Sequence, residues 1–495
     1  MSYFIGVDMG TTATKAVAFD ASGHVVAYQS RHYEMAHPQP DWSEQDPKVL
    51  FDAVLESLVA VLNELGEGCE LVAFSSAMHS LMAVDENGKP LSNLLIWADN
   101  RANSLAEALK ASETGQQIYQ ACGTPIHPMT PLCKLIWWRE NEPELFAKAT
   151  RFVGLKEYVW FRLTGEWVID YSLATATGMF DLKKLAWNEL ALQTAGISAE
   201  RLSKPVSPYT KRALNREIFN SQFSTARRTA FNRAADRVQL IIGASDGCLA
   251  NLGAGAIVPG RLAVTIGTSG AVRVASAEGF TDPEMRTFCY RLDEELFVMG
   301  GGTNSGGVVF EWCCEQFFPG KTSEEVIALS EKIPPGAEGL LFLPYLLGER
   351  APIWNADAKG GFFGLTLQHT PVHMARAVLE GICLHTYSLV KILEERQEIR
   401  EIYASGGFAK SAFWVQLLAD VCGKPVYLPE SIQAGAWGAV LLGMKATGLI
   451  TDFQEKLTGL PIHQIFQPDE KKTQIYQTLF GKFASLYEAT KGLMV

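Results

Sequence analysis

Residues 3–19 read YFIGVDMGTTATKAVAF, and this stretch predicts how the chain begins to fold. The apolar runs at 3–7 and 14–19 are typical of buried strands, and the segment between them is rich in Gly and Thr. A second turn, DASG at 20–23, precedes a third apolar run. We therefore expect the chain to open with strands joined by tight turns, followed by a helix at 47–64 with apolar residues near helical spacing.

A second stretch repeats this pattern about half a chain later. Residues 261–274 read RLAVTIGTSGAVRV, which are again two strand-like runs on either side of a turn of Gly, Thr and Ser. Two such units indicate a duplicated domain. The segment 251–256, rich in Gly and Ala, is the expected crossover. We predict an N-terminal domain at 1–252 and a C-terminal domain at 253–495.

Composition and charge narrow the class of protein. The 495 residues carry 43 basic and 54 acidic side chains, and the net charge of -11 argues against binding to nucleic acid or to an anionic membrane. The nine cysteines have no metal-binding spacing, and neither a signal segment nor a membrane-spanning apolar run is visible. We expect a cytoplasmic protein with reduced thiols. We interpret the basic stretch 211–237 as a solvated surface segment.

Two turns have the composition of phosphate-binding segments. DMGTT at 8–12 and IGTSG at 266–270 place backbone N–H groups and hydroxyls beside glycines, which allow a phosphate to approach closely. Each turn alone is equally typical of a hairpin, and neither matches a Walker or a Rossmann motif. Their occurrence in both halves predicts a clamp on one polyphosphate. Asp8 would hold Mg²⁺, largely through water, and the alternative is a carboxylate that caps the turn.

Two further glycine-rich segments, GGGTNSGG at 300–307 and ASGGFAKS at 404–411, each precede a predicted helix. The N–H groups at the start of a helix favour a nucleotide there; the alternative is an ordinary flexible loop. The residues that we predict to bind the nucleotide are Gly10, Thr11, Thr12, Lys15, Gly267, Thr268, Asn304, Gly306, Gly406, Gly407 and Lys410.

Asp246 lies in GASDG at 243–247, directly after a predicted strand at 238–242. Proteins with parallel sheets place their chemistry at this end of a strand, and phosphoryl transfer needs one carboxylate that accepts a proton from the substrate hydroxyl. The same pattern is equally typical of an Asp that caps the following helix.

The chain resembles the FGGY family of carbohydrate kinases over essentially its whole length. The resemblance rests on ordered segments, namely GVDMGTTATKAV at 6–17, MTPLCKLIW at 129–137, GASDG at 243–247, IGTSG at 266–270, GGFFGL at 360–365 and AVLEG at 377–381. It implies an α/β fold of two related actin/hexokinase-type (ribonuclease H-like) domains with the active site in the cleft between them. The N-terminal domain (1–252) would bind the sugar and carry the catalytic Asp, and the C-terminal domain (253–495) would bind the nucleotide. The resemblance further implies ATP and Mg²⁺ as cofactors, Asp246 as the catalytic base, and Asp8 with Asp246 near the metal.

Within the family, SSAMHS at 75–80, WADNR at 97–101 and GTPIHPM at 123–129 are most similar to gluconate kinases. The resemblance implies ATP-dependent phosphorylation of D-gluconate to 6-phospho-D-gluconate. The residues implied at the substrate are Met78, His79, Asp99, Arg101, Lys156, Asp246 and Arg350.

A cation among these residues would meet the carboxylate of gluconate. The alternative is an ion pair with a neighbouring acid, Arg101 with Asp99, Lys156 with Glu157 and Arg350 with Glu349, and we favour it for at least two of the three. For His79 the alternative is a buried histidine with satisfied hydrogen bonds, which its place after a strand disfavours.

The sequence leaves two other functions open. A xylulose kinase, or another pentulose or polyol kinase of the same family, is the nearer one. A non-kinase ATPase of the same fold, such as a chaperone or a filament protein, is the more distant one, and a chaperone should carry a separate peptide-binding module after the second domain. The family resemblance also leaves a homodimer open.

Overall fold

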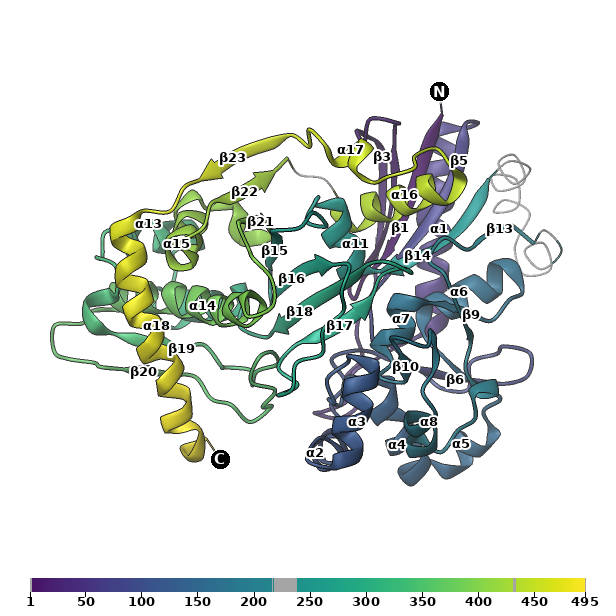
Figure 1. Cartoon of the computed structure of the whole chain (residues 1–495), viewed down its shortest axis with the longest axis horizontal. Helices are drawn as coiled ribbons and strands as arrows, with labels where there is room; N and C mark the ends of the chain where they lie inside the picture. The colour runs from purple at the N-terminus through teal and green to yellow at the C-terminus, as the bar shows by residue number, and fades with distance from the viewer. Residues whose placement is uncertain (1, 216, 218–237, 431–432, 495) are drawn as a thin grey trace. The chain divides into compact units, whose positions relative to one another are not determined.

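The computed structural model describes residues 2–215, 217, 238–430 and 433–494. The chain forms two compact units, and Figure 1 labels many of their helices and strands. Unit 1 comprises 1–254, 277–298 and 432–459, and unit 2 comprises 255–276, 299–431 and 460–495. Because two later segments of the chain pack in unit 1, the compact units differ from the two halves of the sequence. The predicted functional division at residue 252 stays a prediction.

The main sheet of unit 1 has six strands. Their order is β13 (Lys211–Ala213), β14 (Gln239–Ser245), β5 (Cys69–Ser76), β1 (Tyr3–Met9), β2 (Ala13–Phe19) and β3 (Val25–His32). Strands β14, β5 and β1 run parallel, and β2, β3 and β13 are antiparallel to their neighbours. The predicted opening of three strands joined by turns is therefore present.

Two helices cover opposite faces of this sheet. Successive side chains of a strand point to opposite faces, so neighbouring residues of β1 face different helices. Ile5 and Val7 of β1 belong to one buried cluster with apolar residues of α1 (Pro47–Leu65). Gly6, which points the other way, faces α16 (Ala434–Thr447), where a Cβ at Gly6 would lie 2.1 Å from the carbonyl oxygen of Ala436. Only glycine at this position lets the second helix approach so closely.

The rest of the described part of unit 1 contains helices and short strand pairs. The helices are α2 (Asn103–Lys110), α3 (Glu113–Cys122), α4 (Pro131–Asn141), α5 (Pro143–Lys148), α6 (Leu155–Thr164), α7 (Tyr171–Ala176), α8 (Glu189–Ala195), α11 (Asp246–Gly253) and α17 (Gln454–Leu457). The pairs are β4 (Glu44–Gln45) with β7 (Leu94–Leu95), β6 (Met82–Val84) with β8 (Arg151–Val153), β9 (Val168–Asp170) with β12 (Lys204–Val206), and β10 (Phe180–Asp181) with β11 (Ala186–Trp187). Strand β17 (Phe288–Arg291) lies in the segment 277–298.

Unit 2 repeats the topology of unit 1. Its sheet contains, in order, β18 (Phe297–Thr303), β16 (Gly270–Ser276), β15 (Arg261–Ile266), β21 (Glu401–Ser405), β22 (Val426–Pro429) and β23 (Ile462–Phe466). The run β16, β15, β21, β22 corresponds to β2, β1, β5, β14, since in both units an antiparallel hairpin is followed by two parallel strands. This repetition agrees with the duplication that the two turn sequences predict.

The rest of the described part of unit 2 contains helices, together with one short strand pair. They are α12 (Gly307–Phe317), α13 (Ser323–Ser330), α14 (Pro371–Glu394), α15 (Ala412–Cys422) and α18 (Glu470–Thr490), and the pair is β19 (Leu341–Leu343) with β20 (Gly361–Phe363). Of these helices, α14 and α15 contact the sheet. Helix α14 is buried along most of its length.

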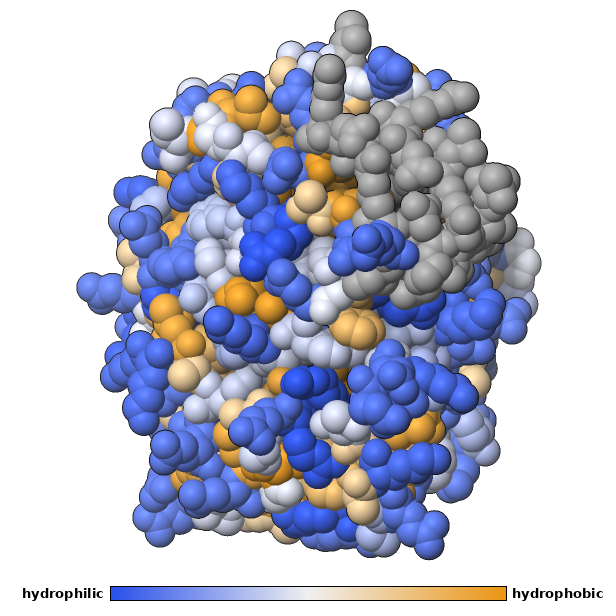
Figure 2. Space-filling view, turned by 90° about the vertical axis from the view of Figure 1, so that its right-hand side faces the viewer, coloured by the Kyte–Doolittle hydropathy of each residue, from blue (hydrophilic) through white to orange (hydrophobic). Residues whose placement is uncertain are grey.

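Polar residues predominate on the face that Figure 2 shows, and the hydrophobic ones among the described residues lie in small scattered groups. Within the described part of the chain, no helix combines the length and the apolar character that crossing a bilayer requires. Of the basic stretch 211–237, Lys211–Ala213 form β13, and residues 216 and 218–237 lie outside the described residues. Its predicted role as a solvated segment stays a prediction.

Candidate active site

Three neighbouring parallel strands of unit 1 deliver predicted site residues to one edge of the sheet. Asp8 is near the carboxyl end of β1, Met78 and His79 follow β5, and Asp246 follows β14. Asp8 and Ala244 both pair with Ser75 of the central strand, so β1 and β14 end at the same level. Adjacent strands lie about 4.8 Å apart, which places the backbones of β1 and β14 about 10 Å apart.

Asp8 is half-buried and accepts a hydrogen bond of 2.7 Å from Ser75 Oγ. Asp8 lies within β1, and the turn follows after Met9. In the antiparallel hairpin its direct partner is Lys15 of β2, so both side chains project from the same face. A Cβ added to Gly435, at the start of α16, would lie 3.5 Å from the carboxylate, in ordinary contact. Asp8 thus lies beside the first turn of α16.

The turn that contains Gly10, Thr11 and Thr12 joins β1 to β2. Side chains from two other segments of the chain donate hydrogen bonds to it. Thr11 accepts hydrogen bonds from Trp97 Nε1 through its hydroxyl (2.9 Å) and from Gln45 Nε2 through its carbonyl oxygen (2.8 Å). The turn therefore connects the two strands of a β-hairpin, which is the alternative that the sequence offered. Binding of phosphate at the same turn stays a prediction.

His79 is 8% exposed and both of its ring nitrogens have partners within unit 1. Nδ1 lies 2.8 Å from the carbonyl oxygen of Ala176, and Nε2 lies 3.2 Å from the hydroxyl of Tyr290. A carbonyl oxygen can only accept, so Nδ1 carries the proton, and in the neutral ring Nε2 is an acceptor. The structure therefore has the hydrogen-bonded, buried histidine that the sequence disfavoured, and substrate binding by His79 stays a prediction.

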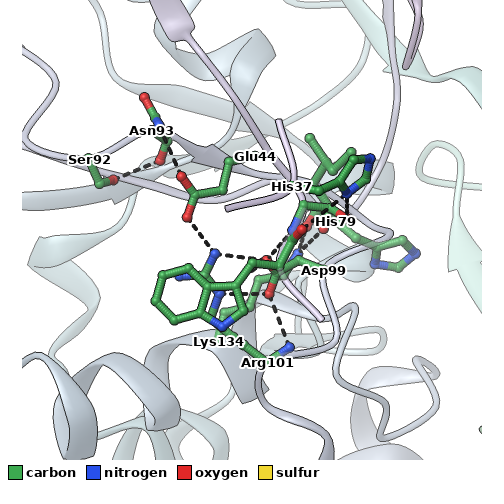
Figure 3. A network of polar contacts seen from close by, with 11 residues as sticks. His37, Glu44, His79, Ser92, Asn93, Asp99, Arg101 and Lys134 are labelled. Atoms are coloured by element: carbon green, nitrogen blue, oxygen red, sulfur yellow. Dashed lines mark hydrogen bonds and ion pairs between the residues drawn. The ribbon is translucent and has the colours of Figure 1, made fainter. Parts of the chain in front are cut away.

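Arg101 is the centre of a buried polar network (Figure 3). Its guanidinium contacts Asp99 at 2.8 Å and Glu44 at 2.5 Å, and it lies 3.8 Å from the ring centroid of Trp42. Asp99 is fully buried and also accepts from the backbone N–H of Ser43 at 2.8 Å. The ion pair with Asp99 that the sequence suggested is therefore present, and it fixes the segment 97–101.

Lys134, a residue of α4, belongs to the same network (Figure 3). Its Nζ is fully buried and donates to the carbonyl oxygens of His79 and Ile96, both at 2.7 Å. Burial lowers the pKa of Lys134 to about 7, partly offset by Asp99. A neutral amine keeps two N–H donors, which is the number that these two carbonyl oxygens use. The side chain joins the segment after β5 to the segment that carries Asp99 and Arg101.

Lys156 has a different partner from the one that the sequence suggested. Its Nζ lies 2.7 Å from Asp170 Oδ2, and Glu157 instead accepts from the backbone N–H of Gly154 at 2.6 Å. Adjacent residues on a helix point in different directions, so Lys156 and Glu157 do not face each other. Burial is the main cause that lowers the pKa of Lys156 and raises that of Glu157 to about 7.

Asp246 is the first residue of α11, and Ser245 occupies the capping position. The predicted strand at 238–242 runs further, to Ser245, so Asp246 follows the strand without an intervening loop. One carboxylate oxygen of Asp246 accepts from the N–H of Gly247 at 2.7 Å. The side chain is half-buried at the edge that also carries Asp8.

In unit 2 three glycine-rich segments meet at the carboxyl ends of β15 and β21. Strand β15 pairs with β21 in parallel through Thr265 and Ser405, and the turn 267–269 and Gly406 follow these two residues. A Cβ on Gly406, whose φ is 101°, would lie 2.4 Å from the carbonyl oxygen of Ile266. A Cβ on Gly306 would lie 2.7 Å from the carbonyl oxygen of Thr268. The predicted nucleotide residues Gly267, Thr268, Gly306, Gly406 and Gly407 are thus neighbours.

Asn304 and Arg350 contact each other near this group. Arg350 donates from Nε to Asn304 Oδ1 and from Nη2 to the carbonyl oxygen of Thr303, both at 2.9 Å. Lys410, by contrast, is exposed at the end of the short 3-10 turn Gly407–Lys410.

Glu349 lies beside Asn304 and Arg350 and binds their backbone N–H groups, not the side chain of Arg350. Its buried carboxylate accepts from the backbone N–H groups of Asn304 (2.6 Å) and Arg350 (2.8 Å) and from the hydroxyl of Ser305, and His385 Nε2 lies 3.1 Å away. Burial alone would raise the pKa of Glu349, but His385 and these donors hold it below its usual value. The sequence suggested an ion pair between the side chains of Arg350 and Glu349. In the structure Glu349 instead accepts from the backbone N–H of Arg350, whose side chain contacts Asn304 and Thr303.

The carboxylates of unit 1 fit Mg²⁺. Among the described residues, no three His, Cys, Asp or Glu side chains gather into a site made of protein ligands alone. Mg²⁺ does not need one, because it keeps several waters and uses one or two carboxylates together with phosphates. Asp8 has accepting capacity beyond its bond to Ser75, and it shares its sheet edge with Asp246.

Comparison with known proteins defines the class. Residues 3–253 match the N-terminal domain, and residues 262–447 the C-terminal domain, of the FGGY family of carbohydrate kinases. A gluconokinase of Bacillus subtilis (strain 168) is 41% identical over 499 residues, which cover 98% of this chain and 95% of that protein. The crystal structures of a gluconate kinase and of a ligand-bound xylulose kinase from Lactobacillus acidophilus each give a TM-score of 0.94 at 36% identity, over 99% of this chain and 98% and 99% of theirs.

The chain therefore belongs to the FGGY family of carbohydrate kinases. This membership confirms the predicted fold of two related actin/hexokinase-type domains and the predicted class, an ATP-dependent sugar kinase. It sets aside the chaperone-type or filament-type ATPase. The cleft between the domains, Mg²⁺ and the individual site residues stay predictions.

Four features near the predicted site were missed by sequence reasoning. Tyr290 is 211 residues from its partner His79, and Asp170 is 14 residues from Lys156. Lys134 stands inside the segment 129–137, which carries the family resemblance, but nothing in the sequence indicates that its side chain is buried. His385 lies within the long, mostly buried helix α14, which also carries Arg376 and Glu380, so nothing in the sequence singles it out.

Proposed function

We propose that this protein transfers the terminal phosphoryl group of ATP to D-gluconate and forms 6-phospho-D-gluconate. The observation that carries the proposal is the shared sheet edge of Asp8, His79 and Asp246 in a chain that is 41% identical to a gluconokinase over 98% of its length. Three adjacent parallel strands provide two carboxylates and one histidine where α/β proteins bind their ligands.

Asp246 is proposed as the base. It orients the terminal hydroxyl of gluconate and accepts its proton as the oxygen attacks the phosphoryl group. The backbone N–H groups around Thr11, Thr12, Gly267 and Thr268 would stabilise the charge on the transferring group. Asp8 and Asp246 would hold Mg²⁺, which neutralises charge on the phosphates when it is bound. Asn304, Gly406, Gly407, Lys15 and Lys410 are proposed to contact the nucleotide.

The chemistry of His79 favours a hydroxyl over a carboxylate as its ligand. Because Nδ1 donates to Ala176, Nε2 of the neutral ring accepts and needs a donor such as the Tyr290 hydroxyl. A sugar hydroxyl can take the place of that donor, whereas an ionised carboxylate cannot donate. We therefore propose that His79 and Met78 meet the hydroxylated part of gluconate. Arg101 and Lys156, each in a buried ion pair, would act on the substrate indirectly.

A xylulose kinase activity is the second candidate, because a xylulose kinase is as similar to this chain in structure and identity as the gluconate kinase from the same organism. Coupled measurement of ADP release with gluconate, xylulose, ribulose, glycerol and fuculose separates the two. The proposal predicts that kcat/KM for gluconate exceeds each other value at least about tenfold, a difference of about 1.4 kcal/mol in transition-state binding. A higher kcat/KM for xylulose would overturn it.

We also propose that the protein works in the cytoplasm, since its nine cysteines are free and buried, as expected of a chain kept reduced. The homodimer stays a prediction that light scattering after size-exclusion chromatography tests directly.

A further inference from the structure

Strand β14 is irregular just before Asp246. Its pairing with β5 is regular from Gln239 to Ile241, shifts register, and resumes at Ala244. At Gly243 the backbone has a φ of 66°, and a Cβ there would lie 1.9 Å from the carbonyl oxygen of Phe74. Because the strand bulges here, the backbone that leads into Asp246 needs support beyond the regular ladder.

Two side chains from outside the sheet supply that support. Lys156 Nζ donates to the carbonyl oxygen of Ala244 at 2.9 Å, and the backbone N–H of Ser245 donates to Ser172 Oγ at 2.7 Å. The carbonyl of Ala244 and the N–H of Ser245 belong to one peptide group. In a trans peptide these two groups point in opposite directions, so the peptide plane is held from both sides.

One carboxylate anchors both of these side chains. Asp170 Oδ2 lies 2.7 Å from Lys156 Nζ, and Asp170 Oδ1 accepts from Ser172 Oγ at 2.6 Å. The same oxygen accepts from the backbone N–H groups of Ser172 and Leu173, at 3.1 and 3.2 Å, which start α7. Asp170 and Ser172 are fully buried and Lys156 is 2% exposed, so water does not compete for these contacts.

We propose that Asp170 is a positioning residue for phosphoryl transfer: through Lys156 and Ser172 it fixes the peptide plane that precedes Asp246. The proposal rests on the assignment of Asp246 as the base. It gives Lys156 a role different from binding the carboxylate of the sugar. A displacement of about 1 Å at a reacting group can lower a rate about 100-fold, so the restraint bears directly on kcat.

The variant Ser172→Ala tests the proposal without removing a charge. It should lower kcat about tenfold or more and leave KM for gluconate and for ATP within about twofold, because the substrates keep their own contacts. Ser112→Ala is the matched control, since Ser112 Oγ also accepts from a backbone N–H, that of Gly115, at the start of α3. Both variants should lower Tm comparably, and the control should keep the wild-type kcat. A wild-type kcat in Ser172→Ala would overturn the proposal.

Asp170→Asn tests the anchor itself. It keeps the shape of the side chain but leaves Lys156 without its counter-charge, and breaking a buried pair can unfold a protein. The double variant Asp170→Asn with Lys156→Met removes both charges and restores a neutral interior. The proposal predicts a kcat at least tenfold below wild type in whichever of these variants folds, and a wild-type kcat there would contradict it.

Asp246→Asn, measured in parallel, separates this proposal from the proposed function. Loss of turnover in Asp246→Asn with normal turnover in Ser172→Ala would refute the positioning role alone. Normal turnover in Asp246→Asn would refute the base, and the positioning role with it.

Discussion

Lys134 Nζ donates a hydrogen bond of 2.7 Å to the backbone carbonyl oxygen of His79. His79 has a φ of 65°, a region that costs a residue with a Cβ about 1–2 kcal/mol. The same nitrogen donates to Ile96, so one buried side chain holds the strained residue and the segment that leads to Arg101. The placement of His79 therefore depends on a residue of α4.

Replacement of Lys134 by Met should weaken gluconate binding more than it slows the reaction. The apolar side chain leaves the carbonyl oxygens of His79 and Ile96 without donors, which costs about 1–3 kcal/mol for a buried group. We expect KM for gluconate to rise about tenfold, with KM for ATP unchanged. Leu135→Ala, in the same core, is the control that should destabilise the fold and keep both KM values. An unchanged KM for gluconate in Lys134→Met would refute this role.

The wild type and Lys134→Met should also differ in how their free energy of unfolding depends on pH. The folded pKa of Lys134 is about 7 and the unfolded value is about 10.4, so between these values the unfolded state binds more protons. Stability should therefore rise with pH through this window in the wild type relative to Lys134→Met. Urea unfolding at pH 6.5, 8 and 9.5 measures the gap between the two free energies of unfolding. A gap that does not change with pH would show that Lys134 is not titrating as stated.

Glu349→Gln should disturb the part of unit 2 that we predict to bind the nucleotide. The amide cannot accept from all the donors that Glu349 now binds, and we expect a loss of about 1–3 kcal/mol in stability at pH 7 and a higher KM for ATP. Because the folded pKa of Glu349 is lowered, its contribution is present above the unfolded value of about 4.3 and is lost as the pH falls further. Chemical unfolding at pH 7 and pH 4 checks this, with exposed Glu324→Gln as the control. Equal losses at both pH values would contradict it.

Gly406 and Gly407 should respond differently to alanine. The φ of 101° and the approach to Ile266 make Gly406→Ala strained, by about 1–3 kcal/mol, so Tm should fall. Nothing lies within 4 Å of a Cβ at Gly407, so Gly407→Ala should keep its Tm. If a phosphate approaches this backbone, Gly407→Ala should nevertheless raise KM for ATP. An unchanged KM in Gly407→Ala would place the nucleotide elsewhere.

The strands and turns that carry the site followed from the sequence because their signals are local. Apolar runs and glycine turns predicted β1, β2, β15 and β16 within one or two residues. Strand β14 was predicted too short, since GASDG reads as a turn although the chain bulges at Gly243 and pairs again. The carboxyl ends of the parallel strands then brought Asp8 and Asp246 to one edge.

Partners distant along the chain did not follow from the sequence. The sequence offered Glu157 as the alternative partner of Lys156, but the folded chain brings Asp170 to it from the start of α7. Residues 277–298, which carry Tyr290, and residues 432–459, which carry α16, join unit 1 through packing that no local pattern announces. One hydrogen-bond partner of the His79 ring, the hydroxyl of Tyr290, lies in the first of these two segments.

The turnover of Asp246→Asn with gluconate and ATP decides whether Asp246 is the base. The amide keeps the shape of the side chain but cannot accept the substrate proton, so kcat should fall at least about 100-fold while nucleotide affinity, measured by calorimetry without Mg²⁺, stays unchanged. A kcat close to that of the wild type, in a folded variant, would show that Asp246 is not the base.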